Sequence, residues 1–149
     1  MARSAVANLH IPNLTPQFGP DPSANEWNML AVGFPVWLHT ERPASLATQV
    51  TQSGITVNLQ ARPAGTTFRM GDGQIERCVA TTPFTASSVP GSPSPTCGHT
   101  YSRVGTYTVQ ATSGWVVSWS ALGYSGEFPL TTTGSASLRI GELKAVVEA

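Results

Sequence analysis

Strict alternation of apolar and polar residues is the strongest pattern in the chain, and it spans residues 104–122. A period of two places successive side chains on opposite faces of a β-strand. The parity continues through Gly114, so the pattern predicts one long strand, or two strands joined at a bend or bulge near that glycine. One parity holds Tyr107, Val109, Ala111, Trp115, Val117 and Trp119, and the other holds Thr106, Thr108, Gln110, Thr112 and Ser118.

Shorter segments of the same character predict further strands. In residues 54–62, Ile55, Val57 and Leu59 share one face, and Thr56, Asn58 and Gln60 share the other. Strands separated by turn signals predict an all-β chain that folds as an antiparallel β-sandwich of about seven to nine strands. Further strands are expected at residues 34–40, 66–70, 74–80 and 135–143, and a loop is expected at residues 125–135.

Asp72 lies between Gly71 and Gly73, with a strand expected on each side of this triplet. Glycine adopts positive φ at low cost, and an aspartate side chain can accept a nearby backbone N–H. The triplet therefore predicts the turn of a β-hairpin. The alternative is that Asp72 is a metal ligand or general base, but a hard cation needs several oxygen ligands and only Glu76 is close in sequence.

A proline-rich segment precedes the alternating region. Residues 1–33 contain few periodic positions, and prolines remove backbone donors, so this segment is expected to form an extended or docked arm. A short helical turn capped by Ser23 is expected within it. Residues 34–149 are then expected to form the folded domain.

A second proline-rich segment, residues 79–96, is flanked by Cys78 and Cys97. A disulfide between these cysteines would close a long loop that has little apolar surface to bury, and would contribute about 3 kcal/mol by loop-closure entropy. The alternative is two unrelated free thiols. We expect the disulfide, and with it an oxidising compartment outside the cytoplasm.

Charge and hydropathy exclude several classes of partner. The formal net charge is zero and the chain has a single lysine, Lys144, so binding to nucleic acid is not expected. No apolar run approaches the roughly 20 residues of a membrane helix. The N-terminus lacks the apolar core of a signal peptide, so the chain is either cytosolic or a mature fragment whose export signal has been removed.

Candidate catalytic and metal-binding residues are few. The histidines His10, His39 and His99 do not have zinc-ligand spacing. No serine lies in a Gly-x-Ser-x-Gly motif, and paired carboxylates are missing. We therefore expect no enzymatic activity, no cofactor and no metal, and expect His99 to form hydrogen bonds within the sandwich.

The tryptophans allow two interpretations. Trp115 and Trp119 share the parity of Val109, which indicates the core, whereas exposed indoles would form a platform for sugar rings. Trp37 alternates with its apolar neighbours and either covers the opposite face or anchors the arm. Trp37 and Phe84 are the residues we expect at a ligand contact, if the protein has one.

Three short motifs occur in order along the chain: Gly71-Asp72-Gly73, His99-Thr100-Tyr101 and Gly105-Thr106-Tyr107-Thr108-Val109. Together they resemble the signature of polycystic-kidney-disease (PKD) domains. The resemblance covers residues 50–112 well and residues 34–149 loosely. It implies an immunoglobulin-like sandwich without enzymatic activity. The motif departs from the family at Phe68, Arg69 and Met70, which stand where the family usually has tryptophan, aspartate and an aromatic residue. The residues that carry the resemblance are Gly71, Asp72, Gly73, His99, Tyr101, Gly105 and Tyr107.

The segments at residues 34–38, 97–101 and 130–135 extend this resemblance to PKD-like cell-envelope proteins of actinobacteria. The resemblance implies an extracellular or cell-envelope location. The expected function is structural and adhesive, with the loop at residues 79–96 as the contact surface for a protein partner or a cell-surface glycan. The alternatives are a carbohydrate-binding module and a subunit of a surface assembly such as a pilus or secretion apparatus, joined by strand addition.

Overall fold

The computed structural model describes residues 10–41 and 44–142, and all the regular structure in them is β-strand apart from one short 3₁₀ turn. The expected all-β fold class is therefore confirmed. Residue 143, the last residue of the strand expected at residues 135–143, lies outside the described residues. The strands are β1 (Gln17–Gly19), β2 (Leu30–Ala31), β3 (Pro35–His39), β4 (Leu46–Gln52), β5 (Ile55–Arg69), β6 (Ile75–Cys78), β7 (Gly98–Thr100), β8 (Gly105–Ala121) and β9 (Tyr124–Gly141).

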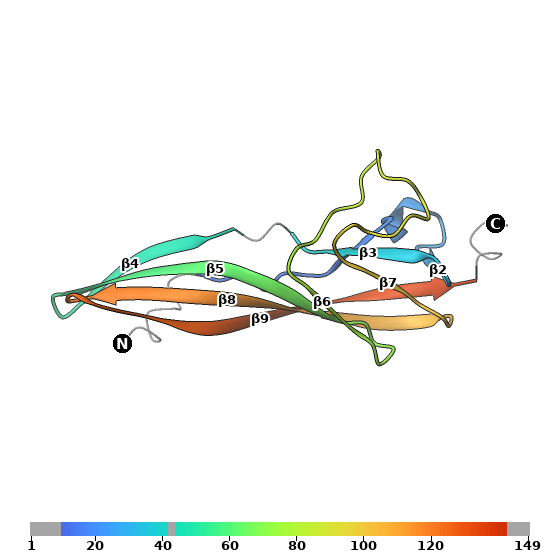
Figure 1. Cartoon of the computed structure of the whole chain (residues 1–149). Helices are drawn as coiled ribbons and strands as arrows, with labels where there is room; N and C mark the ends of the chain where they lie inside the picture. The colour runs from blue at the N-terminus through green and yellow to red at the C-terminus, as the bar shows by residue number, and fades with distance from the viewer. Residues whose placement is uncertain (1–9, 42–43, 143–149) are drawn as a thin grey trace.

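These strands form two sheets in a sandwich-like arrangement. The smaller sheet has the order β1-β3-β7, and the larger has the order β2-β9-β8-β5-β4, with β6 also paired to β5. Figure 1 shows an elongated molecule in which the smaller sheet lies over one half of the larger sheet. We call that half proximal. The other half, which we call distal, consists of β4, residues 55–63 of β5, residues 115–121 of β8 and residues 124–130 of β9.

The long strand expected from the alternation is confirmed as β8, which is continuous through Gly114. The irregularity lies in its neighbour β5, whose register against β8 shifts between Pro63 and Thr66. Pro63 has no N–H to donate to a ladder, which accounts for a break at this point. The two strands expected at residues 54–62 and 66–70 are consequently one strand.

The prediction of a loop at residues 125–135 is wrong, because this segment pairs with β8 along its whole length as part of β9. Glycines and a proline such as Pro129 are typical of turns, yet an outer strand tolerates proline, and the threonines of this segment favour strands. The strand β4 was missed. A two-residue turn, Ser53-Gly54, joins it to β5, and both turn residues have positive φ, 53° and 75°.

Within the N-terminal segment, β1 pairs with β3, so this part of the expected arm is docked. The expected turn exists as a 3₁₀ turn at Pro22–Ala24, but the Ser23 cap is wrong. Asp21 is the capping residue, and its side chain accepts the Ser23 N–H at 2.9 Å. An aspartate one residue before a proline at the first helical position is a strong capping combination.

Two separate apolar clusters stabilise the fold. The proximal cluster lies between the sheets, and the distal cluster lies on one face of the larger sheet. Leu14 from the N-terminal segment is 4% exposed and packs on the distal cluster, where its burial contributes about 2 kcal/mol. The proximal cluster includes Val36, Leu38, Phe68, Met70, Tyr101, Val109 and Leu138. The distal cluster includes Val57, Leu59, Ala61, Trp115, Val117 and Phe128.

Candidate functional site

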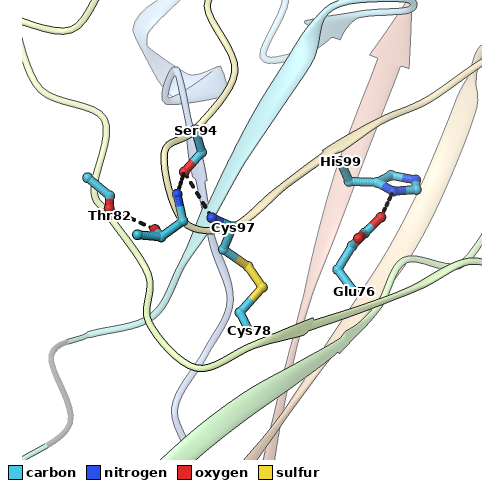
Figure 2. The surroundings of a disulfide bond; sticks show 7 residues. Glu76, Cys78, Thr82, Ser94, Cys97 and His99 are labelled. Carbon is cyan, nitrogen blue, oxygen red and sulfur yellow. Dashed lines mark hydrogen bonds and ion pairs between the residues drawn. A yellow bond between two sulfur atoms is a disulfide. The ribbon is translucent and has the colours of Figure 1, made fainter.

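The disulfide expected from the cysteine spacing is confirmed between Cys78 and Cys97 (Figure 2). Cys78 ends β6, which belongs to the larger sheet, and Cys97 immediately precedes β7 of the smaller sheet. The bond therefore joins the two sheets and closes the loop at residues 79–96. Cys97 is 4% exposed, so the bond is shielded on its β7 side.

Short polar contacts hold the two arms of this loop together. The hydroxyls of Thr82 and Thr96 are 2.7 Å apart, which ties the loop across its base. The Ser94 hydroxyl accepts the backbone N–H groups of Thr96 and Cys97, at 3.2 and 3.1 Å (Figure 2). A loop with few apolar residues gains order from such side chain to backbone bonds.

Trp37 of β3 anchors the far part of the loop. Its indole N–H donates to the Ser92 carbonyl at 2.7 Å, and its ring meets Phe84 edge to face, with centroids 5.1 Å apart. Trp37 is 7% exposed, and Phe84 is half-buried and packs against Gly19. The structure thus brings the two candidate ligand-contact residues together, but most of their surface is used in fixing the loop.

Two valines of the loop point into solvent. Val79 is 96% exposed and Val89 is 66% exposed. We missed both in the sequence. Val89 is a single apolar residue within a run of serine, proline and glycine, and Val79 falls within the strand expected at residues 74–80. An ordered loop that presents apolar side chains from a rigid scaffold is a common form of protein contact surface.

The Gly-Asp-Gly triplet forms the turn of the β5–β6 hairpin, as predicted. Asp72 Oδ1 accepts the Gln74 N–H at 2.9 Å, which is the expected turn contact. Asp72 Oδ2 lies 2.7 Å from Nε2 of His99, and Glu76 Oε2 lies 2.7 Å from Nδ1 of the same ring (Figure 2 shows the second contact). The β5–β6 hairpin therefore holds the ring of His99 between two carboxylates.

The contacts to His99 also affect the pKa of Asp72. Carboxylates only accept hydrogen bonds, so both contacts to His99 are hydrogen bonds when both ring nitrogens carry a proton. Partial burial by itself raises the pKa of Asp72, but hydrogen bonds from His99 and the Gln74 amide, with the charge of His99, outweigh burial and hold the pKa below its ordinary value. Asp72 is thus a structural carboxylate that ties the larger sheet to the smaller one.

The rings of His99, Tyr101 and Tyr107 connect this contact to the proximal cluster. Tyr101 is fully buried, meets His99 edge to face, and stacks on Tyr107 with centroids 4.3 Å apart. Its hydroxyl donates to the Met70 carbonyl at 2.7 Å, and burial raises its pKa, so it remains a neutral phenol. Gly105 begins β8 beside the Tyr107 ring. The seven motif residues named from the sequence therefore gather around one joint between the sheets.

A cleft of about 670 Å³ lies at the junction of the proximal and distal halves. The described residues that line it carry no charged side chain, and burial lowers the pKa of its His39. The Ser113 hydroxyl and His39 Nδ1 have no hydrogen-bond partner among the described residues, but both atoms are inaccessible. These two atoms are therefore not available to a molecule in the cleft.

Within residues 10–41 and 44–142, no three histidine, cysteine, aspartate or glutamate side chains are placed to hold a metal ion. No helix in this part of the chain is long and apolar enough to cross a membrane. No family model, no curated protein and no solved structure matches the chain. The contacts described above are therefore the basis for the functional argument.

Proposed function

We propose that the protein is a non-enzymatic, PKD-like module that acts outside the cytoplasm and binds a protein partner at the bacterial cell surface. The observation that carries this proposal is the loop at residues 79–96. A disulfide, Trp37 and Ser94 hold it in place, while Val79 and Val89 remain exposed. Ordering the loop before binding lowers the entropic cost of association.

The joint between the sheets supports the PKD-like assignment. Gly71 and Tyr107 are 36 positions apart in the sequence, yet both lie at this joint. A shared structural role accounts for the occurrence of the three motifs in one chain. The assignment implies an immunoglobulin-like topology of the sandwich and a source among actinobacterial cell-envelope proteins. Fold and motif together favour a scaffold role, since none of the motif side chains is left as a free nucleophile or base.

The disulfide supports an extracytoplasmic location. Disulfides persist in oxidising compartments and are rare in the reducing cytosol. We therefore place the working protein at the cell envelope or in the extracellular space.

Binding to actinobacterial cells tests this function. Fluorescently labelled protein should bind intact cells, and binding should fall at least about tenfold in Val89→Asp, since a carboxylate in an apolar contact is strongly unfavourable. Val104→Asp is the matched control, because Val104 is 51% exposed but lies outside the loop. Binding that survives protease treatment of the cells, or equal loss in the two variants, would contradict a protein contact through the loop.

A carbohydrate platform is less well supported. Such a platform needs exposed aromatic faces, whereas Trp37 and Trp115 are 7% and 1% exposed. The Trp119 ring lies half-buried against Gly126. The alternative of a surface-assembly subunit gains more support, because the distal half of the larger sheet ends in β4, which pairs only with β5 among the described residues.

A further inference from the structure

Strand β4 is the last strand of the larger sheet, and among the described residues it pairs with β5 alone. Figure 1 shows its outer side facing away from the rest of the molecule. A terminal strand presents a row of N–H and C=O groups that can pair with another chain. The identity of the exposed groups determines what kind of strand can pair there.

The turn at Ser53-Gly54 fixes which groups point outward. In a two-residue hairpin with both turn residues at positive φ, the flanking residues, here Gln52 and Ile55, exchange hydrogen bonds with each other. Hydrogen-bonded and non-hydrogen-bonded pairs then alternate along the strand. The main-chain groups of Ala47, Gln49 and Thr51 therefore face the open edge, and this set is symmetric about Gln49.

The β4 side chains carry none of the features that usually protect an open edge. The strand reads Leu-Ala-Thr-Gln-Val-Thr-Gln, without a charge, proline or glycine. The outer strand on the other side of the distal half, β9, carries Glu127 and Pro129. Charged residues and proline are the common devices that prevent edge-to-edge pairing, so only the β9 side has them.

The apolar face of the sheet also stops at β4. Leu46 and Val50 pack against the distal cluster and are only half-buried. Thr48 shares their face, while Gln49 lies on the opposite, exposed face, where its side-chain amide donates to Asn58 Oδ1 at 2.7 Å. A strand added beside β4 would cover the open flank of Leu46 and Val50.

We infer that the β4 edge pairs with the β4 edge of a second copy of this chain, antiparallel and centred on Gln49. In this register Gln49 lies opposite Gln49 of the second copy, and Ala47 lies opposite its Thr51. Each copy then contributes three outward donors and three outward acceptors, which gives six hydrogen bonds in a continuous sheet across the two copies. Val50 lies beside Thr48 of the second copy and closes the apolar face.

The edge favours a second copy as its partner for two reasons. The outward groups are symmetric about the strand centre, as a two-fold, self-complementary interface requires. The strand is uncharged and the net charge of the chain is zero, so like charges do not meet when identical edges approach. This inference does not rest on the proposed function of the loop, which lies in the other half of the molecule.

Sedimentation of the whole chain over a concentration series tests the pairing. We expect a monomer–dimer equilibrium with a dissociation constant below about 1 mM. Gln49→Lys should weaken dimerisation at least about tenfold, because two lysines then meet at the two-fold axis. Asn58→Lys is the matched control: it loses the same side-chain hydrogen bond and adds the same charge on the same face, but on the inner strand β5.

Mixing Gln49→Lys with Gln49→Glu tests the register. Each variant alone should be monomeric, and the mixture should form a one-to-one dimer, since only pairing at residue 49 places the opposite charges together. A monomeric wild-type chain at about 1 mM would overturn the proposal. Equal weakening by Asn58→Lys, or no dimer in the mixture, would overturn it as well.

Discussion

Gly71 shows how one backbone position can determine a turn. Its φ is +82°, and a Cβ atom added there would lie 2.8 Å from the carbonyl oxygen of Thr108 in β8. We predict that Gly71→Ala lowers the free energy of unfolding by about 2–3 kcal/mol, through backbone strain and this contact. Urea denaturation followed by circular dichroism measures the change.

Gly73 is the control for this prediction. It also has positive φ, +91°, but a Cβ atom there would meet nothing within 4 Å. Gly73→Ala should therefore cost only about 1 kcal/mol, the strain alone. Equal losses at the two glycines would show that the approach to Thr108 does not contribute.

Asp72 gives a prediction about pH. Its pKa is lowered in the folded protein, so its ionised contacts contribute stability above its unfolded pKa, and this contribution is lost as the pH falls through the lower, folded pKa. Asp72→Asn should lower the free energy of unfolding by about 1 kcal/mol at pH 7 and by progressively less below pH 3.8, the ordinary value. Urea denaturation of both proteins between pH 7 and pH 2 measures this. A difference that is constant across the series would contradict the ionic role.

The joint around His99 was only partly predictable from the sequence. A hydrogen-bonding role of His99 and the turn role of Asp72 followed from residue type and local context. The two carboxylates on either side of the ring did not, because 27 and 23 residues separate them from His99. The β5–β6 hairpin places the two carboxylates, β7 places His99, and the packing of the two sheets brings these groups together.

At the scale of elements, the loop at residues 79–96 depends on one covalent and several polar ties. We predict that Cys78→Ala/Cys97→Ala lowers the free energy of unfolding by about 3 kcal/mol, because the open chain gains entropy in the unfolded state. Thermal unfolding of the oxidised proteins, with limited proteolysis of the loop, measures both the stability and the order of the loop.

Trp37→Phe tests the hydrogen bond to the loop separately from the disulfide. It keeps the disulfide and most of the ring, but removes the donor to the Ser92 carbonyl, so it should cost about 1 kcal/mol and increase cleavage near residue 92. If the disulfide variant is as stable as the wild type, closure of this loop does not stabilise the fold.

Strands were predictable where a single period ran without interruption. β8 was recognised because its alternation is continuous, and its partner β9 was missed in part because Pro129 and its glycines are also typical of loops. β4 has weak contrast, since threonine and glutamine occur on both of its faces. The hydrophobic pattern identifies a strand only when one face is clearly buried, and β4 is an outer strand with no fully buried side chain.

At the scale of the whole molecule, the two apolar clusters are separate, but three long strands run through both. β5, β8 and β9 each contribute residues to the proximal and the distal cluster. The sequence could not reveal this division, because the same strands supply both clusters. The contribution of Leu14 to the distal cluster was equally hidden, since it comes from a segment far away in the chain. Continuous strands couple the halves, since a strand cannot lose its partners in one half without loosening the ladder in the other.

This coupling predicts one cooperative unfolding transition. Val109 in the proximal cluster and Val117 in the distal cluster are both 0% exposed and both lie on β8. Val109→Ala and Val117→Ala should each lower the free energy of unfolding by about 2 kcal/mol, because each leaves a cavity of similar size. In each variant, circular dichroism and tryptophan fluorescence should give coincident urea transitions. If Val117→Ala instead gives an early fluorescence transition that circular dichroism follows only in part, the distal half unfolds independently, and the shared strands do not couple the two clusters.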